Sequence, residues 1–267
     1  MRFVRYRDGE DTPAWGMVDG EASVAPLTVP FDRWAPVVTT GDEPDGFVDR
    51  SRRLDLGGLR LLPPVEPTAK IVCVGANYRS HIEAVGMKMP SAPVAFLKAQ
   101  TAVIASGDPI LRSPLTAELD YEVELVGVVG GPGPALLGYT AGNDITARDL
   151  QRGEFGLDLY SGKSLDRTCP IGPWIVTIDE IGPPAVDLEM TLTVNGELRQ
   201  HDRTSAMEWS VDELLAYVEA RTHLQCGDLV FTGTPAGVGL ETGRYLQPGD
   251  VVEATIEHIG TIRNTVQ

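Results

Sequence analysis

Hydrophobic and polar residues alternate in many short segments of this chain, whereas few segments repeat at helical spacing. Alternation indicates β-strands, because neighbouring side chains of a strand point to opposite faces. Residues 2–6, 15–18, 189–200 and 251–258 show it, and the Asn195-Gly196 pair predicts a tight hairpin turn. About ten to twelve short strands are expected on these signals. This count favours an α+β protein that is predominantly β, with a closed or rolled sheet, over an alternating βαβ fold.

Two segments carry signals for a helix. The clearer one spans residues 210–221, where Ser210 and Glu213 form a predicted capping box ahead of an apolar face made by Leu214, Leu215 and Val218. A shorter helix is predicted after Thr146, which has capping-box spacing to Asp149.

A proline-rich stretch, residues 61–68, divides the chain into a predicted small N-terminal domain, residues 1–62, and a main domain, residues 63–267. The first part carries no recognisable chemistry, and its expected role is packing against the main body or a second subunit. Further along, residues 76–93 combine few apolar positions with Gly86, Pro90 and Pro93. We expect this segment to be a mobile lid, and it carries His81.

Composition narrows the possible partners. The net charge of −16 disfavours binding to nucleic acid and to anionic membranes. No apolar run is long enough to span a membrane, and the first residues lack the apolar core of a signal peptide. Three scattered cysteines lack metal-ligand spacing. A cytoplasmic protein with reduced thiols is therefore expected.

The most informative chemistry begins with four acidic residues at alternate positions, Glu118, Asp120, Glu122 and Glu124. On one strand they would share a face, where like charges repel. Either a bound divalent cation or exposure to solvent would explain the pattern, because hard cations take carboxylate oxygens.

A second acidic group follows at a predicted turn. Asp144 precedes the short helix on which Arg148 and Gln151 share a face. With the acidic strand, these groups could hold a metal ion and an acidic ligand. The alternative for Arg148 is a surface ion pair with Asp149 or Glu154.

Several segments in order resemble motifs of the fumarylacetoacetate hydrolase family: VCVGANYRSH, DYEVELVGVVG, GYTAGNDITARDLQ, GKSLDRTCPIGPWIV and FTGTPAGVG. The resemblance covers residues from about 60 to 267. Several motifs that agree in order are far more specific than any one of them. It implies a mixed β-sandwich roll, a homodimer, and Mg²⁺ or Mn²⁺ as cofactor. It also implies a function for eight residues: Glu122, Glu124 and Asp144 as metal ligands, Arg148, Gln151 and Thr234 as substrate-binding groups, and His81 and Lys163 as catalytic groups.

The resulting hypothesis is a divalent-metal-dependent hydrolase. It would cleave a C–C bond in a 2,4-dioxo acid, such as an acylpyruvate or a fumarylacetoacetate-like compound, through a metal-stabilised enolate. The lid and residues 155–160 are expected to set the substrate's distal group. Arg167, which replaces a residue common in the family, is expected to alter the pocket wall.

The lid departs from the family pattern. The family commonly places a Glu at the third position after the lid His, but this chain has Ala84 there, and Glu83 would point away on a helix. Two alternatives thus stay open at the same site. One is decarboxylation of oxaloacetate, or isomerisation or decarboxylation of 2-hydroxymuconate-type diacids. The other is a non-catalytic protein that binds metal and 2-oxo acids, against which His81 and Lys163 argue.

Overall fold

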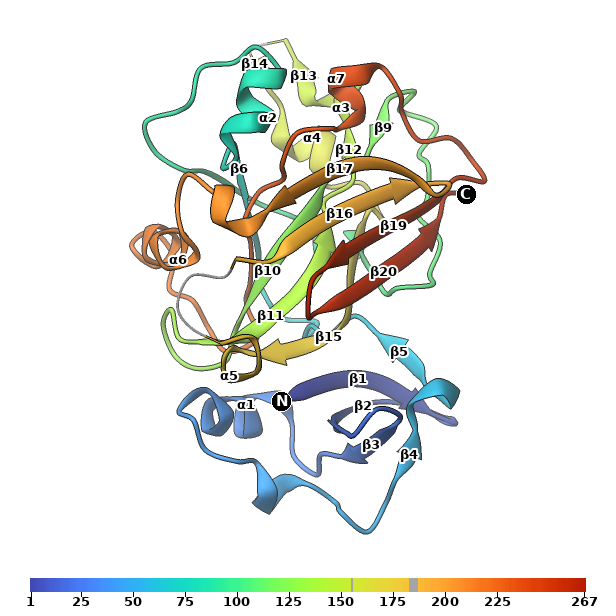
Figure 1. The fold of residues 1–267 in the computed structure, drawn as a ribbon, viewed down its shortest axis with the longest axis vertical. Helices are drawn as coiled ribbons and strands as arrows, with labels where there is room; N and C mark the ends of the chain where they lie inside the picture. Colours follow the sequence, from blue (N-terminus) through green and yellow to red (C-terminus); the bar gives the residue numbers. More distant parts are fainter. Residues whose placement is uncertain (155, 183–186) are drawn as a thin grey trace.

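Two β-sheets packed face to face form the body of the molecule. The computed structural model describes residues 1–154, 156–182 and 187–267. In Figure 1, the smaller sheet (β17, β16, β19, β20) lies in front of strands β10, β11 and β15 of the larger one. Apolar side chains from both sheets meet in one core, for example Leu125 and Val123 with Leu192 and Ala254. This fold is α+β and predominantly β, as predicted.

The larger sheet has twelve strands in the order β4-β3-β2-β1-β15-β11-β10-β18-β6-β7, with β5 also paired to β1 and β8 to β15. Most neighbours are antiparallel, but β18 pairs β6 and β15 pairs β8 in parallel, so the sheet is mixed. Its strands are β1 (Arg2–Asp8), β2 (Glu10–Asp19), β3 (Ser23–Pro26), β4 (Leu54–Asp55), β5 (Arg60–Leu62), β6 (Ile71–Gly75), β7 (Val94–Leu97), β8 (Val103–Ile104), β10 (Val123–Val129), β11 (Leu136–Asn143), β15 (Cys169–Thr177) and β18 (Leu229–Phe231).

The remaining elements are shorter or lie at the edges. The second sheet comprises β16 (Glu189–Val194), β17 (Glu197–Arg203), β19 (Val251–Ile256) and β20 (Gly260–Thr265), and two small ribbons pair β9 (Leu119–Asp120) with β12 (Thr146–Ala147) and β13 (Arg152–Gly153) with β14 (Gly156–Leu157). The α-helices are α1 (Phe31–Thr39), α2 (Arg79–Ala84), α3 (Arg148–Gln151), α4 (Leu159–Lys163), α5 (Ile178–Ile181), α6 (Val211–Glu219) and α7 (Gly239–Thr242), and 3-10 turns occupy Asp45–Phe47, Leu56–Gly58, Gln100–Ala102 and Thr204–Ala206.

Several local predictions can be compared with these elements. The hairpin turn is confirmed, since Asn195 and Gly196 both have positive φ between β16 and β17. The capping box of α6 is also confirmed, with Ser210 and Glu213 bonded reciprocally. The predicted number of strands was too low, since the described residues form twenty strands. Several of these have two residues, which is too short to show an alternation.

The second predicted capping box was wrong. Helix α3 begins after Ala147, which has no side-chain cap. Thr146 instead donates to the carbonyl of Asp144 at 2.9 Å, and the Asp149 carboxylate accepts from the Thr116 hydroxyl and the backbone N–H of Ala117. Thr146 is therefore used by the turn before it, and Asp149 by a loop that no local spacing could indicate.

The N-terminal strands join the main body through β1, which pairs antiparallel with β15. Helix α1, which was not predicted, covers this junction (Figure 1). It has helical spacing of buried residues, but the internal Pro36 masks the pattern. Its Trp34 is fully buried against Phe3, with ring centroids 4.4 Å apart, and also contacts Trp15 and Phe31.

Trp34→Ala is expected to lower the free energy of unfolding by about 3–5 kcal/mol, because it removes the centre of this aromatic cluster. Trp34→Phe should cost less, since the indole N–H has no hydrogen-bond partner in the structure. Urea unfolding of both variants measures this. A loss below about 1 kcal/mol for the alanine variant would show that the cluster does not hold the junction together.

Residues 76–93, called the lid segment below, connect β6 to β7. Its start is fixed by Asn77, which is fully buried and donates to the carbonyls of Trp209 and Thr232 and accepts from the Trp209 N–H. Only α2 interrupts its irregular course. Its mobility remains a prediction.

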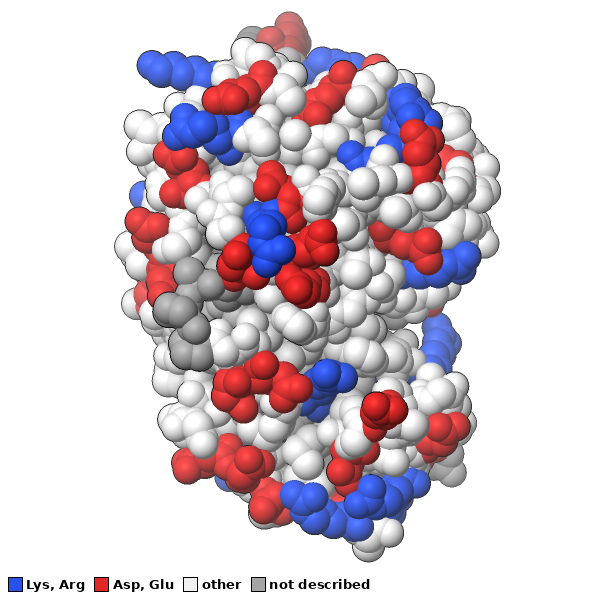
Figure 2. Space-filling model, viewed as in Figure 1, with Lys and Arg blue, Asp and Glu red and all other residues white. Residues whose placement is uncertain are grey.

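Two surface features bear on the partners. Helices of the described residues are all too short or too polar to cross a membrane. Figure 2 shows acidic side chains scattered over the face in view, with basic ones interleaved rather than gathered into a continuous area.

Cys73, Cys169 and Cys226 are free thiols, as expected.

Candidate active site

A cavity of about 190 Å³ opens between the lid segment, the ends of β10 and β11, helices α3 and α4, and the loop after β18. Pockets for larger ligands usually measure about 300–1,000 Å³, so this one suits a small molecule. All eight residues singled out in the sequence line it: His81, Glu122, Glu124, Asp144, Arg148, Gln151, Lys163 and Thr234. Arg167 does not line it and instead bonds the carbonyl of Pro109, so the prediction for this residue was wrong.

The four alternating acidic residues do not share one strand face. The chain leaves regular strand geometry at Tyr121 and Glu122, between β9 and β10. Glu118 consequently pairs with Arg152 at the surface, and Asp120 turns into a separate buried position. The opposite face agrees better with expectation, because Tyr121, Val123 and Leu125 are buried.

Glu122, Glu124 and Asp144 form what we call the carboxylate triad. Each offers an oxygen within 4.8 Å of the others, and all three side chains are buried. Antiparallel pairing of β10 with β11 brings them together, and the Asp144 N–H donates to the Glu122 carbonyl at 2.9 Å. The Glu124 carboxylate accepts from the Gly233 N–H at 2.7 Å. A set of buried carboxylate oxygens at this separation fits a hard divalent cation such as Mg²⁺ or Mn²⁺.

Buried cations hold two members of the triad. The Lys163 ammonium donates to Glu122 at 2.6 Å and to Asp144 at 2.8 Å, and Lys98, the residue after β7, bonds the other oxygen of Asp144. Burial alone would lower the pKa of Lys163, but Asp144 and Glu122 outweigh burial and raise it. Lys163 therefore stays protonated at neutral pH.

The triad members differ in their charge balance. Burial would raise the pKa of Glu122, but Lys163 and Arg148 hold it at about 2. Burial raises the pKa of Glu124 well above its ordinary value, and Asp144 and Glu122 raise it further. Glu124 is thus the member whose charge the protein leaves least compensated, and a divalent cation would supply the missing positive charge.

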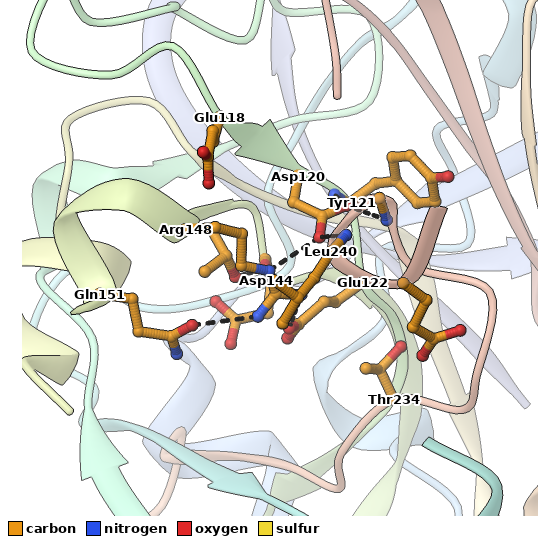
Figure 3. Close-up of polar contacts among 12 residues, drawn as sticks. Glu118, Asp120, Tyr121, Glu122, Asp144, Arg148, Gln151, Thr234 and Leu240 are labelled. Carbon is orange, nitrogen blue, oxygen red and sulfur yellow. Dashed lines mark hydrogen bonds and ion pairs between the residues drawn. The ribbon is translucent and has the colours of Figure 1, made fainter. Parts of the chain in front are cut away.

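The Arg148 guanidinium lies between three acceptors, as Figure 3 shows. Its Nε donates to Asp120 at 2.7 Å, one terminal nitrogen donates to Glu122 at 2.6 Å, and the other donates to Gln151 at 3.2 Å. The surface ion pair with Asp149 or Glu154 is therefore not what the structure contains. Arg148 and Gln151 share a face of α3, as predicted, and both line the cavity.

Asp120 connects Arg148 to a second part of the site. Its carboxylate also accepts from the N–H groups of Gly239 and Leu240, at 2.6 and 2.9 Å, at the start of α7. A Cβ on Gly239 would lie 2.7 Å from an Asp120 oxygen, so a larger residue would push the two apart. The sequence placed Asp120 in the acidic pattern, but it carried no signal for this link.

His81 has a partner that was not predicted. Its Nδ1 lies 2.9 Å from Glu241 of α7, and both side chains are largely buried. The other Glu241 oxygen accepts from the Gly237 N–H at 2.6 Å. Glu83 is exposed on α2, as the helical geometry required. A separation of 160 residues hides the His81–Glu241 pair from any local pattern.

Thr234 reaches the cavity from the loop after β18. Its hydroxyl donates to the Val123 carbonyl at 2.9 Å and accepts from Gln200 at 2.8 Å. With its hydroxyl proton already donated, Thr234 shapes the wall of the cavity in this structure.

Comparisons with known proteins agree with this arrangement. Residues 70–267 match the family model described as fumarylacetoacetate (FAA) hydrolase C-terminal. Oxaloacetate tautomerase YisK of Bacillus subtilis is 39% identical over 227 residues, covering 79% of this chain and 74% of that protein.

Two solved structures are also similar to this chain in fold and sequence. 2-Hydroxyhepta-2,4-diene-1,7-dioate isomerase from Mycobacterium marinum has a TM-score of 0.80 at 34% identity and covers 100% of this chain and 98% of its own. Fumarylpyruvate hydrolase from Pseudomonas aeruginosa, in complex with Mn²⁺ and pyruvate, has a TM-score of 0.69 at 32% identity and covers 78% of this chain and 91% of its own. The chain belongs to the fumarylacetoacetate hydrolase family, a family of enzymes.

Proposed function

We propose that this protein is a divalent-metal-dependent hydrolase that cleaves the C–C bond of a 2,4-dioxo acid. The observation that carries the proposal is one small cavity lined both by the carboxylate triad and by His81, whose Nδ1 is paired with Glu241 behind it. The triad fits the electrophilic half of such a reaction, and the pair fits the activation of water. The complex of a related fumarylpyruvate hydrolase with Mn²⁺ and pyruvate supports it.

The acid end of the substrate would lie beside the triad. Glu122, Glu124 and Asp144 would hold Mg²⁺ or Mn²⁺, which as a Lewis acid stabilises negative charge on the 2-oxo oxygen. Arg148 and Gln151 would orient the 1-carboxylate, with Thr234 closing that side. Lys163, kept protonated by its two carboxylate partners, would add a second positive charge near the same oxygen.

The distal carbonyl would lie toward His81. With Glu241 at its Nδ1, the Nε2 of His81 is free to accept a proton from water. Water adds to the C4 carbonyl, the bond between C3 and C4 breaks, and its electron pair stays on the pyruvate enolate. His81 returns the proton to C3, which gives pyruvate and a carboxylic acid.

The homodimer implied by the family resemblance belongs to the same proposal, and light scattering measures the mass of the assembly.

A second candidate is tautomerisation or decarboxylation of oxaloacetate or of a related diacid. It is favoured by the likeness to YisK, named an oxaloacetate tautomerase, and to the Mycobacterium marinum isomerase. These reactions need no added water. An assay for pyruvate release from an acylpyruvate, run beside oxaloacetate tautomerisation and CO₂ release, separates the candidates. Turnover of oxaloacetate without acylpyruvate cleavage would overturn the hydrolase.

Glu241→Gln is expected to lower acylpyruvate hydrolysis by about 10²–10⁴-fold, because a neutral amide cannot stabilise the protonated His81. The matched control is Glu219→Gln. Glu219 also lies 2.8 Å from the Nδ1 of a histidine, but that histidine, His223, is exposed on the surface. Steady-state kinetics should show the control at wild-type rates. Equal rates for both variants would remove His81 from the water-activating role.

A further inference from the structure

The cavity is divided into a charged end and an aliphatic end. The charged end holds the carboxylate triad with Arg148 and Lys163. A further part of the lining, which we call the aliphatic wall, lies beside His81 and the exposed Lys88 and consists of Ile82, Val85, Met87, Val94, Leu157 and Leu240. They come from the lid segment, β7, β14 and α7. In the proposed arrangement they would face the part of a substrate beyond its 2-oxo acid group.

Two of the three lysine and arginine side chains in the described lining are used at the charged end, and His81 is paired with Glu241. Arg148 is bonded to Asp120 and Glu122, and Lys163 to Glu122 and Asp144. Lys88 is the remaining lysine or arginine in that lining, and it is exposed on the lid segment. A second carboxylate placed against the aliphatic wall, where Ile82 is buried but Met87, Val94 and Leu157 are exposed, would lose part of its water without gaining a buried partner in the described lining. An alkyl group would gain from leaving water.

We propose that the substrate carries a short, uncharged aliphatic acyl group at its distal end rather than a second carboxylate. This inference rests on the proposed function for the position of the acid end. It selects alkyl acylpyruvates from the 2,4-dioxo acids and sets this chain apart from relatives named for dicarboxylates, such as fumarylpyruvate hydrolase. The small volume of the cavity limits the chain to a few carbons.

Kinetics on an acyl series measures the preference directly. From acetylpyruvate to propanoylpyruvate and butanoylpyruvate, kcat/KM should rise about fourfold for each added methylene until the wall is covered. Butanoylpyruvate should exceed fumarylpyruvate by about tenfold, as expected for a carboxylate that loses part of its water without gaining a partner. Equal or faster cleavage of fumarylpyruvate would overturn the inference while leaving the hydrolase proposal intact.

A binding experiment separates the two proposals. 2-Oxoheptanoate and 2-oxohexanedioate have similar shapes and differ in the distal carboxylate, and neither contains the bond to be cleaved. With Mg²⁺ present, calorimetry should give a lower Kd for 2-oxoheptanoate. If no acylpyruvate is cleaved but this order holds, the proposed function fails and the distal preference stands. If 2-oxohexanedioate binds as tightly or more tightly, the distal preference fails.

Two variants test where the preference arises. Leu157→Lys places a cation in the aliphatic wall and should reduce or reverse the preference, and the control Leu198→Lys changes a similarly exposed leucine outside the cavity, at 57% against 60% exposure. Lys88→Met should leave the affinity for 2-oxohexanedioate unchanged. A fall in that affinity would identify Lys88 as a distal anion site and contradict the inference.

Discussion

Glu124→Gln is expected to abolish metal-dependent turnover, with a fall in kcat/KM of at least about 10³-fold. It should also remove the thermal stabilisation by Mg²⁺, which for the wild type at about a hundred times Kd amounts to about 2.7 kcal/mol. The amide keeps the shape of the side chain and can still accept from the Gly233 N–H. It cannot supply the negative charge that a divalent cation requires.

The same substitution should have the opposite effect on the metal-free protein. Burial and the neighbouring Asp144 and Glu122 raise the pKa of Glu124, so a neutral residue relieves repulsion there. In a chelator the variant should melt at or above the wild-type temperature. Glu118→Gln is the control, since Glu118 comes from the same acidic stretch but pairs with Arg152 at the surface. Retained Mg²⁺ stabilisation in the Glu124 variant would place the cation elsewhere.

Asp120→Asn is expected to lower kcat/KM by about 10²–10³-fold, although Asp120 contacts no substrate in the proposed arrangement. The Asp120 carboxylate accepts hydrogen bonds from Arg148 and from the N–H groups of Gly239 and Leu240. An asparagine has one oxygen and one NH₂ group, so its NH₂ group would face at least one of these donors. Arg148 and α7 should both shift. We therefore expect KM to rise through Arg148 and kcat to fall through Glu241.

A matched variant separates this positioning from general destabilisation. Asp228 is equally buried, pairs with Lys70 at 2.6 Å and accepts backbone N–H groups, but it lies outside the cavity lining. Asp228→Asn should lose stability while keeping KM and kcat per folded molecule. Losing one partner of a buried ion pair costs about 3–5 kcal/mol, so both variants should show lower unfolding midpoints. The loss should be smaller for Asp228→Asn, because the Lys70 side chain is 28% exposed. An unchanged KM for Asp120→Asn would reduce Asp120 to a structural residue.

Local sequence patterns predicted the features that depend on neighbouring residues. The alternation in β16 and β17, the Asn195-Gly196 turn and the capping box of α6 all follow from interactions over a few positions. The family motifs went further, because they gathered eight residues that the fold brings to one cavity. Their assigned functions remain predictions.

Contacts between distant segments could not be predicted in this way. His81 pairs with Glu241, Asp120 binds the start of α7, and Lys98, the residue after β7, bonds Asp144, each across a separation that leaves no periodic trace. The acidic alternation from Glu118 to Glu124 was misleading for the same reason. That interpretation assumed one continuous strand. In the structure, strand geometry stops at Tyr121 and Glu122, so that β9 pairs with β12 and β10 pairs with β11.

Strands β6 and β7 pair with each other at the two ends of the lid segment. Gly75 and Val94 are register partners, so residues 76–93 leave and re-enter the sheet at adjacent positions. If its buried residues Asn77, Tyr78 and Ile82 are kept, the exposed part of such a loop can be exchanged between homologues with little effect on the fold beneath it. A chimera that takes this segment from a dicarboxylate-specific relative, with its histidine retained, would transplant selectivity onto an unaltered metal centre.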